Sequence, residues 1–227
     1  MKTIVLIMAS IVLLIAGTAS AEYSSSLYLG SNYLSNIFIT EGGAPETTTG
    51  GPVGPSTLDG VPLEYVYCVD LYRDVYVPVT YPDTVVTNNG VIYGNSTPVN
   101  NAAQIAWLLY TYAATATTKD QQAALQVAIW HEEYNGNVSL NQKYAPSTQY
   151  SYYSAYLTSL GSNTGNVGNF LWMTPTDSSG IEYQAQVGVE VGASPTVDVS
   201  SVPIPSSVYL LGLGLAGSIG LKQRIFG

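Results

Sequence analysis

Two residues of this chain have a chemistry that their sequence surroundings leave unexplained. Cys68, the only cysteine, lies in the stretch "YVYCVDL". In a secreted protein, a cysteine without a partner indicates an intermolecular bond, a reactive thiol or another covalent fate. The alternative is an inert thiol, because free cysteines are often buried as small hydrophobic side chains.

The second residue is Gln126, in the apolar stretch "QAALQVAIWH". On a helix that turns by about 100° per residue, Ala123, Ile129 and Trp130 share its side, so Gln126 is expected to point inward. A buried amide without a partner costs on the order of 1–3 kcal/mol, which predicts a partner for Gln126. An ordinary hydrogen bond to the backbone would meet that expectation without any covalent chemistry.

Two helices are predicted around Gln126. Asn101 and Gln104 form a capping-box pattern before the apolar run "IAWLLYTYAA". Thr118 and Gln121 form a T-x-x-Q capping box at the start of the helix that carries Gln126. The Tyr/Ser-rich stretch "YSYYSAYLTSL" is a candidate for a third, short helix.

Strand patterns fill much of the remaining chain. Cys68 lies in the strand predicted for Leu63–Tyr72, in which alternate side chains face opposite sides of a sheet. Further strands are predicted in "SLYLGSNYLSNIFIT", in "VYVPVTY" and in "TVVTNNGVIYG", the last with an Asn-Gly turn. Residues 181–191 alternate cleanly between apolar and other positions, which also predicts a strand.

Residues 41–60 are rich in Gly, Pro and Thr and are expected to form a mobile loop. Together these patterns predict one α+β domain over residues 22–192. Its architecture is an antiparallel β-sandwich or barrel-like sheets with a small two- to three-helix insertion. An N-terminal signal and a C-terminal transmembrane helix complete the expected fold class.

Both ends of the chain carry targeting patterns. Residues 1–21 read as a secretory signal peptide with Lys2, an apolar core and an A-x-A site, and cleavage is expected after Ala21. Residues 193–205 form a linker, and residues 206–227 form a hydrophobic sorting or transmembrane tail whose basic end predicts a domain outside the membrane. The V-P-x-P motif and the basic end comprise Val202, Pro203, Pro205, Lys222 and Arg224.

The charge of the chain restricts its partners. Between Glu22 and Val202 the basic residues are Arg73, Lys119 and Lys143, against all fifteen Asp and Glu residues. Such a surface lacks the cations that neutralise phosphates, which argues against nucleic acid as a partner. One cysteine and one histidine cannot assemble a zinc site. The composition gives no sign of a metal or organic cofactor and leaves open a calcium ion among surface Asp and Asn residues.

Two resemblances add to this reading. The C-terminal pattern resembles the PEP-CTERM sorting signal of Gram-negative bacteria, which implies an exosortase-like processing enzyme and delivery to the envelope, cell surface or extracellular matrix. Within residues 67–134, "YCVDL", "QIAWLL" and "ALQVAIW" resemble the thioester domains of bacterial surface proteins. Cys68 takes the position of that family's cysteine, and Gln126 takes that of its glutamine.

The second resemblance implies covalent attachment. The Cys68 sulfur would add to the Gln126 side-chain carbonyl and ammonia would leave; an amine or hydroxyl on a surface protein or polysaccharide would later take the acyl group. Asp70 would orient the site or cap a turn, and an aromatic cover would exclude water. The candidates for this cover are Tyr65, Tyr67, Trp107 and Trp130.

Three classes of function follow. The leading prediction is a non-enzymatic, envelope-tethered, adhesin-like protein that captures its target through a Cys68–Gln126 thioester. The alternative is a structural protein of the envelope or extracellular matrix, without a thioester, in which both residues are merely buried. The third is a hydrolase with Cys68 as nucleophile and His131 as base. For His131 the sequence also leaves open assistance to an attacking nucleophile or a solvated place at the helix end.

Overall fold

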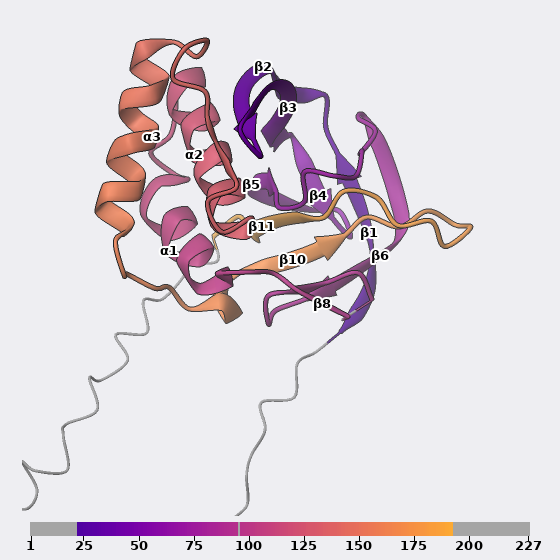
Figure 1. Ribbon diagram of the computed structural model, residues 1–227. Helices are drawn as coiled ribbons and strands as arrows, with labels where there is room; N and C mark the ends of the chain where they lie inside the picture. The colour runs from indigo at the N-terminus through magenta and orange to yellow at the C-terminus, as the bar shows by residue number, and fades with distance from the viewer. Residues whose placement is uncertain (1–21, 95, 193–227) are drawn as a thin grey trace, which may run out of the picture.

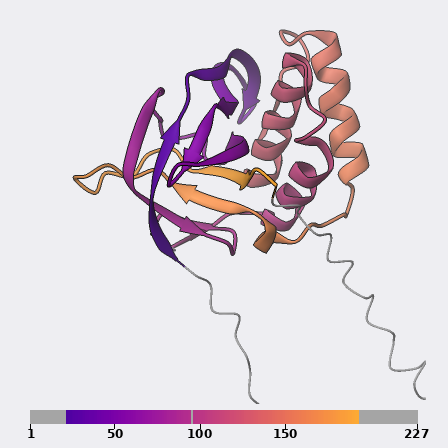
Figure 2. The same cartoon turned by 180° about the vertical axis from the view of Figure 1, so that it is seen from behind.

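The computed structural model describes residues 22–94 and 96–192, which form an α+β fold. Figure 1 shows the sheets on one side and the helices on the other, and Figure 2 shows the same two halves from behind. The predicted signal peptide, V-P-x-P linker and hydrophobic tail lie outside the described residues. None of the helices in the described ranges combines the length and hydrophobicity that a bilayer span requires.

Six antiparallel strands close into a barrel. They are β1 (Tyr23–Leu29), β4 (Ser56–Leu58), β5 (Val61–Cys68), β6 (Val79–Thr87), β10 (Leu171–Thr174) and β11 (Gln186–Glu190). Their order around the barrel is β1-β4-β5-β11-β10-β6. Side chains of these strands form an apolar cluster that includes Leu27, Val66, Tyr81 and Met173. Of the two predicted arrangements, the structure therefore has the barrel.

A three-stranded sheet packs beside the barrel. It has the order β3 (Ala44–Gly54), β2 (Asn32–Glu41), β9 (Val138–Leu140), and β3 also packs against β5. The prediction of a mobile loop over residues 41–60 is wrong, because β3 pairs with β2 along its length. As an edge strand β3 tolerates proline, which is why its composition resembles that of a loop. A small separate ribbon joins β7 (Val91–Ile92) to β8 (Thr97–Pro98).

Three helices cover one side of the sheets (Figures 1 and 2): α1 (Ala102–Tyr112), α2 (Lys119–Glu133) and α3 (Ser147–Leu160). Helix α2 contacts both other helices as well as β2, β3, β5 and β9, so residues 123–130 are buried all round. Its predicted capping box is confirmed, with Gln121 N–H donating to Thr118 Oγ1 and Thr118 N–H donating to Gln121 Oε1. A short 3-10 helix, η1 (Val167–Asn169), precedes β10.

Helix α1 begins differently from the prediction. Asn101 adopts a left-handed conformation with φ of 47°, and its side chain makes no capping hydrogen bond. Its Nδ2 instead donates to the Glu132 carbonyl at 3.0 Å, which ties the start of α1 to the end of α2. The predicted capping box of Asn101 and Gln104 is therefore wrong, because a contact between helices takes the side chain that the cap needed.

Several predicted strands have different bounds. β5 ends at Cys68, β6 begins at Val79, and residues 181–191 contribute only Gln186–Glu190 as a strand. After the Asn-Gly turn, β7 pairs with β8 and does not return along β6. Residues 65–68 are buried on both faces, because the barrel cluster lies on one side and the helices on the other. Alternation along the strand predicts that only one of its faces is buried, but at the end of β5 both faces are buried.

Candidate functional site

The structure places the Gln126 side chain against the backbone of Cys68. Gln126 Oε1 accepts hydrogen bonds from the Gly51 N–H at 2.8 Å and from the Cys68 N–H at 3.0 Å, and Nε2 donates to the Cys68 carbonyl at 2.7 Å. The whole side chain is buried, with 0% exposure. The expectation of a partner for Gln126 is confirmed, and that partner is largely Cys68.

The carboxamide fills a gap in the hydrogen-bond ladder of β5. Strand β4 pairs with β5 only as far as Leu63, while β11 lies along the opposite edge as far as Cys68. The Cys68 N–H and C=O that face away from β11 bond to Gln126, which reaches them from α2. A helical side chain thus takes the place of a strand neighbour, which fixes its carboxamide relative to Cys68.

Two glycines allow β3 to close over this site. A Cβ at Gly50 would lie 2.8 Å from Gln126 Cγ and 2.9 Å from Trp130 Cη2. A Cβ at Gly51 would lie 2.9 Å from Tyr67 Cα and 3.0 Å from Gln126 Oε1. Real Cβ atoms do not approach so closely, so only glycines let the β3 backbone deliver the Gly51 N–H.

The Cys68 thiol lies in the same buried site. Burial raises the pKa of Cys68 to about 12, and the nearby Asp70 charge adds to the increase. The Gln186 side chain and the Gly51 N–H, both close to the thiol, act in the opposite direction and lower its pKa. The Gly51 N–H that bonds to Gln126 Oε1 therefore also lies close enough to the Cys68 sulfur to affect the thiol pKa. Thiol and carboxamide converge on one backbone group.

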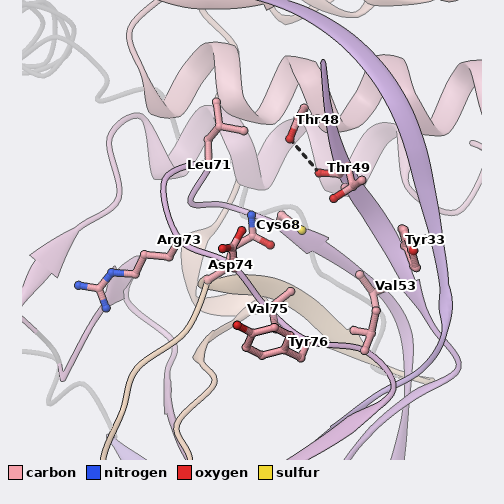
Figure 3. A pocket seen from close by; sticks show the side chains of 13 residues that line it. Tyr33, Thr48, Thr49, Val53, Cys68, Leu71, Arg73, Asp74, Val75 and Tyr76 are labelled. Carbon is pink, nitrogen blue, oxygen red and sulfur yellow. Dashed lines mark hydrogen bonds between the residues drawn. The ribbon is translucent and has the colours of Figure 1, made fainter. Parts of the chain in front are cut away.

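A pocket of about 270 Å³, partly open to solvent, leads to Cys68. Figure 3 shows the Cys68 sulfur among side chains from β3 and from the loop after β5. Thr48 and Thr49 come from β3, whereas Asp74 and Tyr76 come from that loop. Cys68 and Gly50 line the pocket and Gln126 does not, so a small molecule in the pocket meets Cys68 before the carboxamide.

Asp70 fixes the chain segment that follows Cys68. Its Oδ1 accepts from the Tyr72 N–H at 2.8 Å, which closes a turn after β5. The same oxygen accepts from the Tyr134 hydroxyl at 3.0 Å, and the Tyr93 hydroxyl donates to Oδ2. The structure shows the turn-capping role predicted for Asp70, and its role in orienting the thioester site stays a prediction.

The predicted aromatic cover is divided between two places. Trp130 is fully buried beside Gly50 and Gln126, and Tyr67 lies under Gly51. Tyr65 packs on Tyr67 at a ring distance of 6.2 Å. Trp107 makes an edge contact with Tyr112 on α1 instead. The residues that cover the carboxamide are therefore Trp130, Tyr67 and the two glycines.

His131 faces away from Cys68. Its Nδ1 lies 3.0 Å from the Val138 carbonyl of β9 and 2.9 Å from the Tyr153 hydroxyl of α3. The pocket that reaches Cys68 is lined by residues that do not include His131. The structure does not bring these two side chains together, so it gives a thiol–imidazole hydrolase no support.

A buried carboxyl next to this region makes stability depend on pH. Burial is the main reason that the pKa of Glu133 is raised from 4.5 to about 8; a hydrogen bond with the Asn100 backbone opposes this increase and the Asp70 charge adds to it. Between those two pH values the folded chain binds a proton that the unfolded chain has lost, so stability falls as the pH rises.

We expect Glu133→Gln to remove this dependence. Urea denaturation at pH 5 and pH 8 should show a smaller loss of unfolding free energy in Glu133→Gln than in wild type. The expected difference is on the order of 2 kcal/mol after allowance for solvent screening. An equal loss of unfolding free energy between pH 5 and pH 8 in both proteins would contradict a raised pKa at Glu133.

Comparison with known proteins was made at three levels: no family model, curated protein or solved structure matches this chain. The resemblances to thioester domains and PEP-CTERM signals therefore stay predictions. Within the part of the chain that the structure describes, no three His, Cys, Asp or Glu side chains are grouped to hold a metal ion. Sequence reasoning missed Gly50, Gly51 and Gln186; the adjacent glycines of "TTGGP" were the available signal for the first two.

Proposed function

We propose that this chain is an exported, envelope-tethered protein that captures a nucleophile-bearing target through a thioester between Cys68 and Gln126. The observation that carries the proposal is the fully buried Gln126 carboxamide, which hydrogen bonds from the Gly51 and Cys68 N–H groups and to the Cys68 carbonyl hold against the backbone of the cysteine. The targeting part rests on the sequence patterns at the two chain ends. Capture occurs once per molecule, so the protein is not an enzyme under this proposal.

The hydrogen bonds at Gln126 suit the formation of the thioester. The Cys68 sulfur bonds to Gln126 Cδ, the C–N bond breaks, and ammonia leaves with the thiol proton. During the addition Oε1 gains negative charge, and the N–H groups of Gly51 and Cys68 already point at that atom. Donors placed in this way form an oxyanion hole, in which the loss of one donor costs about 10²–10³ in rate.

The pocket supplies the route for the target. An amine or hydroxyl bonds to the Gln126 carbonyl carbon, the C–S bond breaks, and the Cys68 sulfur takes the proton that the nucleophile gives up. The high thiol pKa opposes formation of a free thiolate, but a fixed geometry compensates, since proximity can lower a barrier by about 7–11 kcal/mol. Trp130 and β3 cover the carboxamide and limit hydrolysis.

A structural role is the second candidate, and one observation favours it. Gln126 has backbone partners for both ends of its carboxamide without any covalent bond. In that case Cys68 is an ordinary buried thiol and Gln126 is a link between α2 and β5. The two candidates differ in mass, which makes them easy to separate.

The test is the intact mass of the purified protein. We expect wild type to be lighter than its sequence mass by one ammonia and Cys68→Ala to have its full mass. Methylamine should then add to wild type only, and peptide mapping should place the adduct on Gln126. If wild type has its full sequence mass and forms no adduct, the thioester is rejected and the structural role is the candidate that remains.

A further inference from the structure

A second buried glutamine lies beside the Cys68 sulfur. Gln186 is the direct cross-strand partner of Cys68 in the antiparallel pair of β11 and β5. Directly opposed residues in such a pair point to the same face, with Cβ atoms about 4.5–5.5 Å apart. Gln186 is 0% exposed, so its carboxamide is held beside Cys68 and out of contact with solvent.

The hydrogen bonds of Gln186 leave part of its carboxamide available. Its Nε2 donates to the Gln184 carbonyl at 3.0 Å, and the Gln184 Oε1 lies at 3.4 Å. Its Oε1 has no hydrogen-bond partner among the described residues. The two N–H groups of Nε2 thus point to Gln184. The 3.4 Å contact is the weaker of the two, so the N–H that makes it is the one available to the Cys68 sulfur across the strand pair.

The two glutamines therefore play different parts around one thiol. Gln126 is held at its oxygen by backbone N–H groups, which polarises its carbonyl for attack. The Gln186 oxygen has no such donors within the described part of the chain. We propose that Gln186 donates an N–H to the Cys68 sulfur and stabilises the negative charge that this sulfur carries as its bond to the Gln126 acyl group forms and breaks.

The role of Gln186 in capture rests on the proposed function. When an amine takes the acyl group, the C–S electron pair moves to sulfur, and the sulfur then accepts the proton that the amine loses. A donor at the sulfur lowers the free energy of that charge in both directions, because the same charge develops during thioester formation. Gln186 is not consumed and exchanges no atom with the target.

The test measures the thiol directly. After complete reaction with methylamine the Cys68 thiol is free whether or not a thioester had formed, so the pH dependence of its alkylation by iodoacetamide, followed up to pH 9, reports thiolate content separately from access to the thiol. We expect Gln186→Met to slow this alkylation by about tenfold, since a hydrogen bond to a charged group is lost. Methionine keeps an unbranched side chain of similar size in the site. Methylamine capture by untreated protein should slow by a similar factor.

Gln149→Met is the matched control. Gln149 is also a buried glutamine whose Oε1 has no partner in the described ranges, but it lies on α3. Its replacement should change stability without changing alkylation. If Gln186→Met does not fold, Gln186→Asn keeps an amide but withdraws it from the sulfur, and it should also slow alkylation. Unchanged alkylation in a folded Gln186 variant overturns this inference; slowed alkylation without any mass deficit upholds the contact and rejects the thioester.

Discussion

Replacement of Gln126 by leucine in a Cys68→Ala background is expected to lower the free energy of unfolding by at least about 3 kcal/mol. Cys68→Ala cannot form a thioester, so the carboxamide stays intact and its hydrogen bonds are measured alone. Leucine leaves three buried backbone groups without partners: the Gly51 N–H and the N–H and C=O of residue 68. Each such group costs about 1–3 kcal/mol. Urea denaturation of the two proteins gives the difference.

Gln126→Glu in the same background is the control for shape. A protonated carboxyl reproduces the amide, because its carbonyl oxygen accepts the two N–H groups and its O–H donates to the C=O of residue 68. Burial raises the pKa of this carboxyl above the unfolded value of about 4.3, so the folded chain keeps a proton that the unfolded chain loses. Stability should match the parent near pH 4 and fall as the pH rises. A leucine variant as stable as its parent would show that these bonds do not hold α2 to β5.

The helical half of the fold could be predicted because its signals are local. Thr118 and Gln121 satisfy each other within one turn, so the start of α2 follows from four consecutive residues. The inward direction of Gln126 follows from helical periodicity in the same way. Asn101 shows the limit of such reasoning, since its side chain bonds to the end of another helix and leaves its own cap unmade.

The sheet half was predicted less well because its burial is set by distant segments. Residues 41–60 have the composition of a loop, yet β3 is held by pairing with β2 and by packing against β5. The stretch "TTGGPVG" contains no local signal that a glutamine from a helix packs against it. The need for glycine at positions 50 and 51 follows only from the packing of Gln126, Trp130 and Tyr67 around them, which the sequence does not show.

Gln186 illustrates the same limit at the candidate site itself. In the sequence it is one polar residue in an alternating strand, where the natural expectation is a solvent-facing side chain. In the structure both faces of β11 are buried, as they are for the end of β5. The partner of Cys68 on β11 is fixed by strand register, and register depends on closure of the whole barrel.

Gly51→Ala is expected to abolish the ammonia deficit and the methylamine adduct. The new Cβ would lie 2.9 Å from the Tyr67 Cα, a backbone atom that cannot turn aside as a side chain can. The β3 backbone must therefore move away, which removes the Gly51 N–H from Gln126 Oε1. We expect a loss of about 1–3 kcal/mol in stability as well, the usual cost of overpacking a closed site.

Gly54→Ala is the matched control, because it changes a glycine of the same strand where the nearest heavy atom to a new Cβ is 4.0 Å away. That variant should keep the deficit, the adduct and the stability of wild type. Intact mass before and after methylamine, with urea denaturation, compares the three proteins. A folded Gly51→Ala chain that retains both deficit and adduct would mean that the thioester forms without the donor that β3 brings. The adduct therefore tests the contribution of a backbone N–H to acyl transfer separately from the contribution of the thiol.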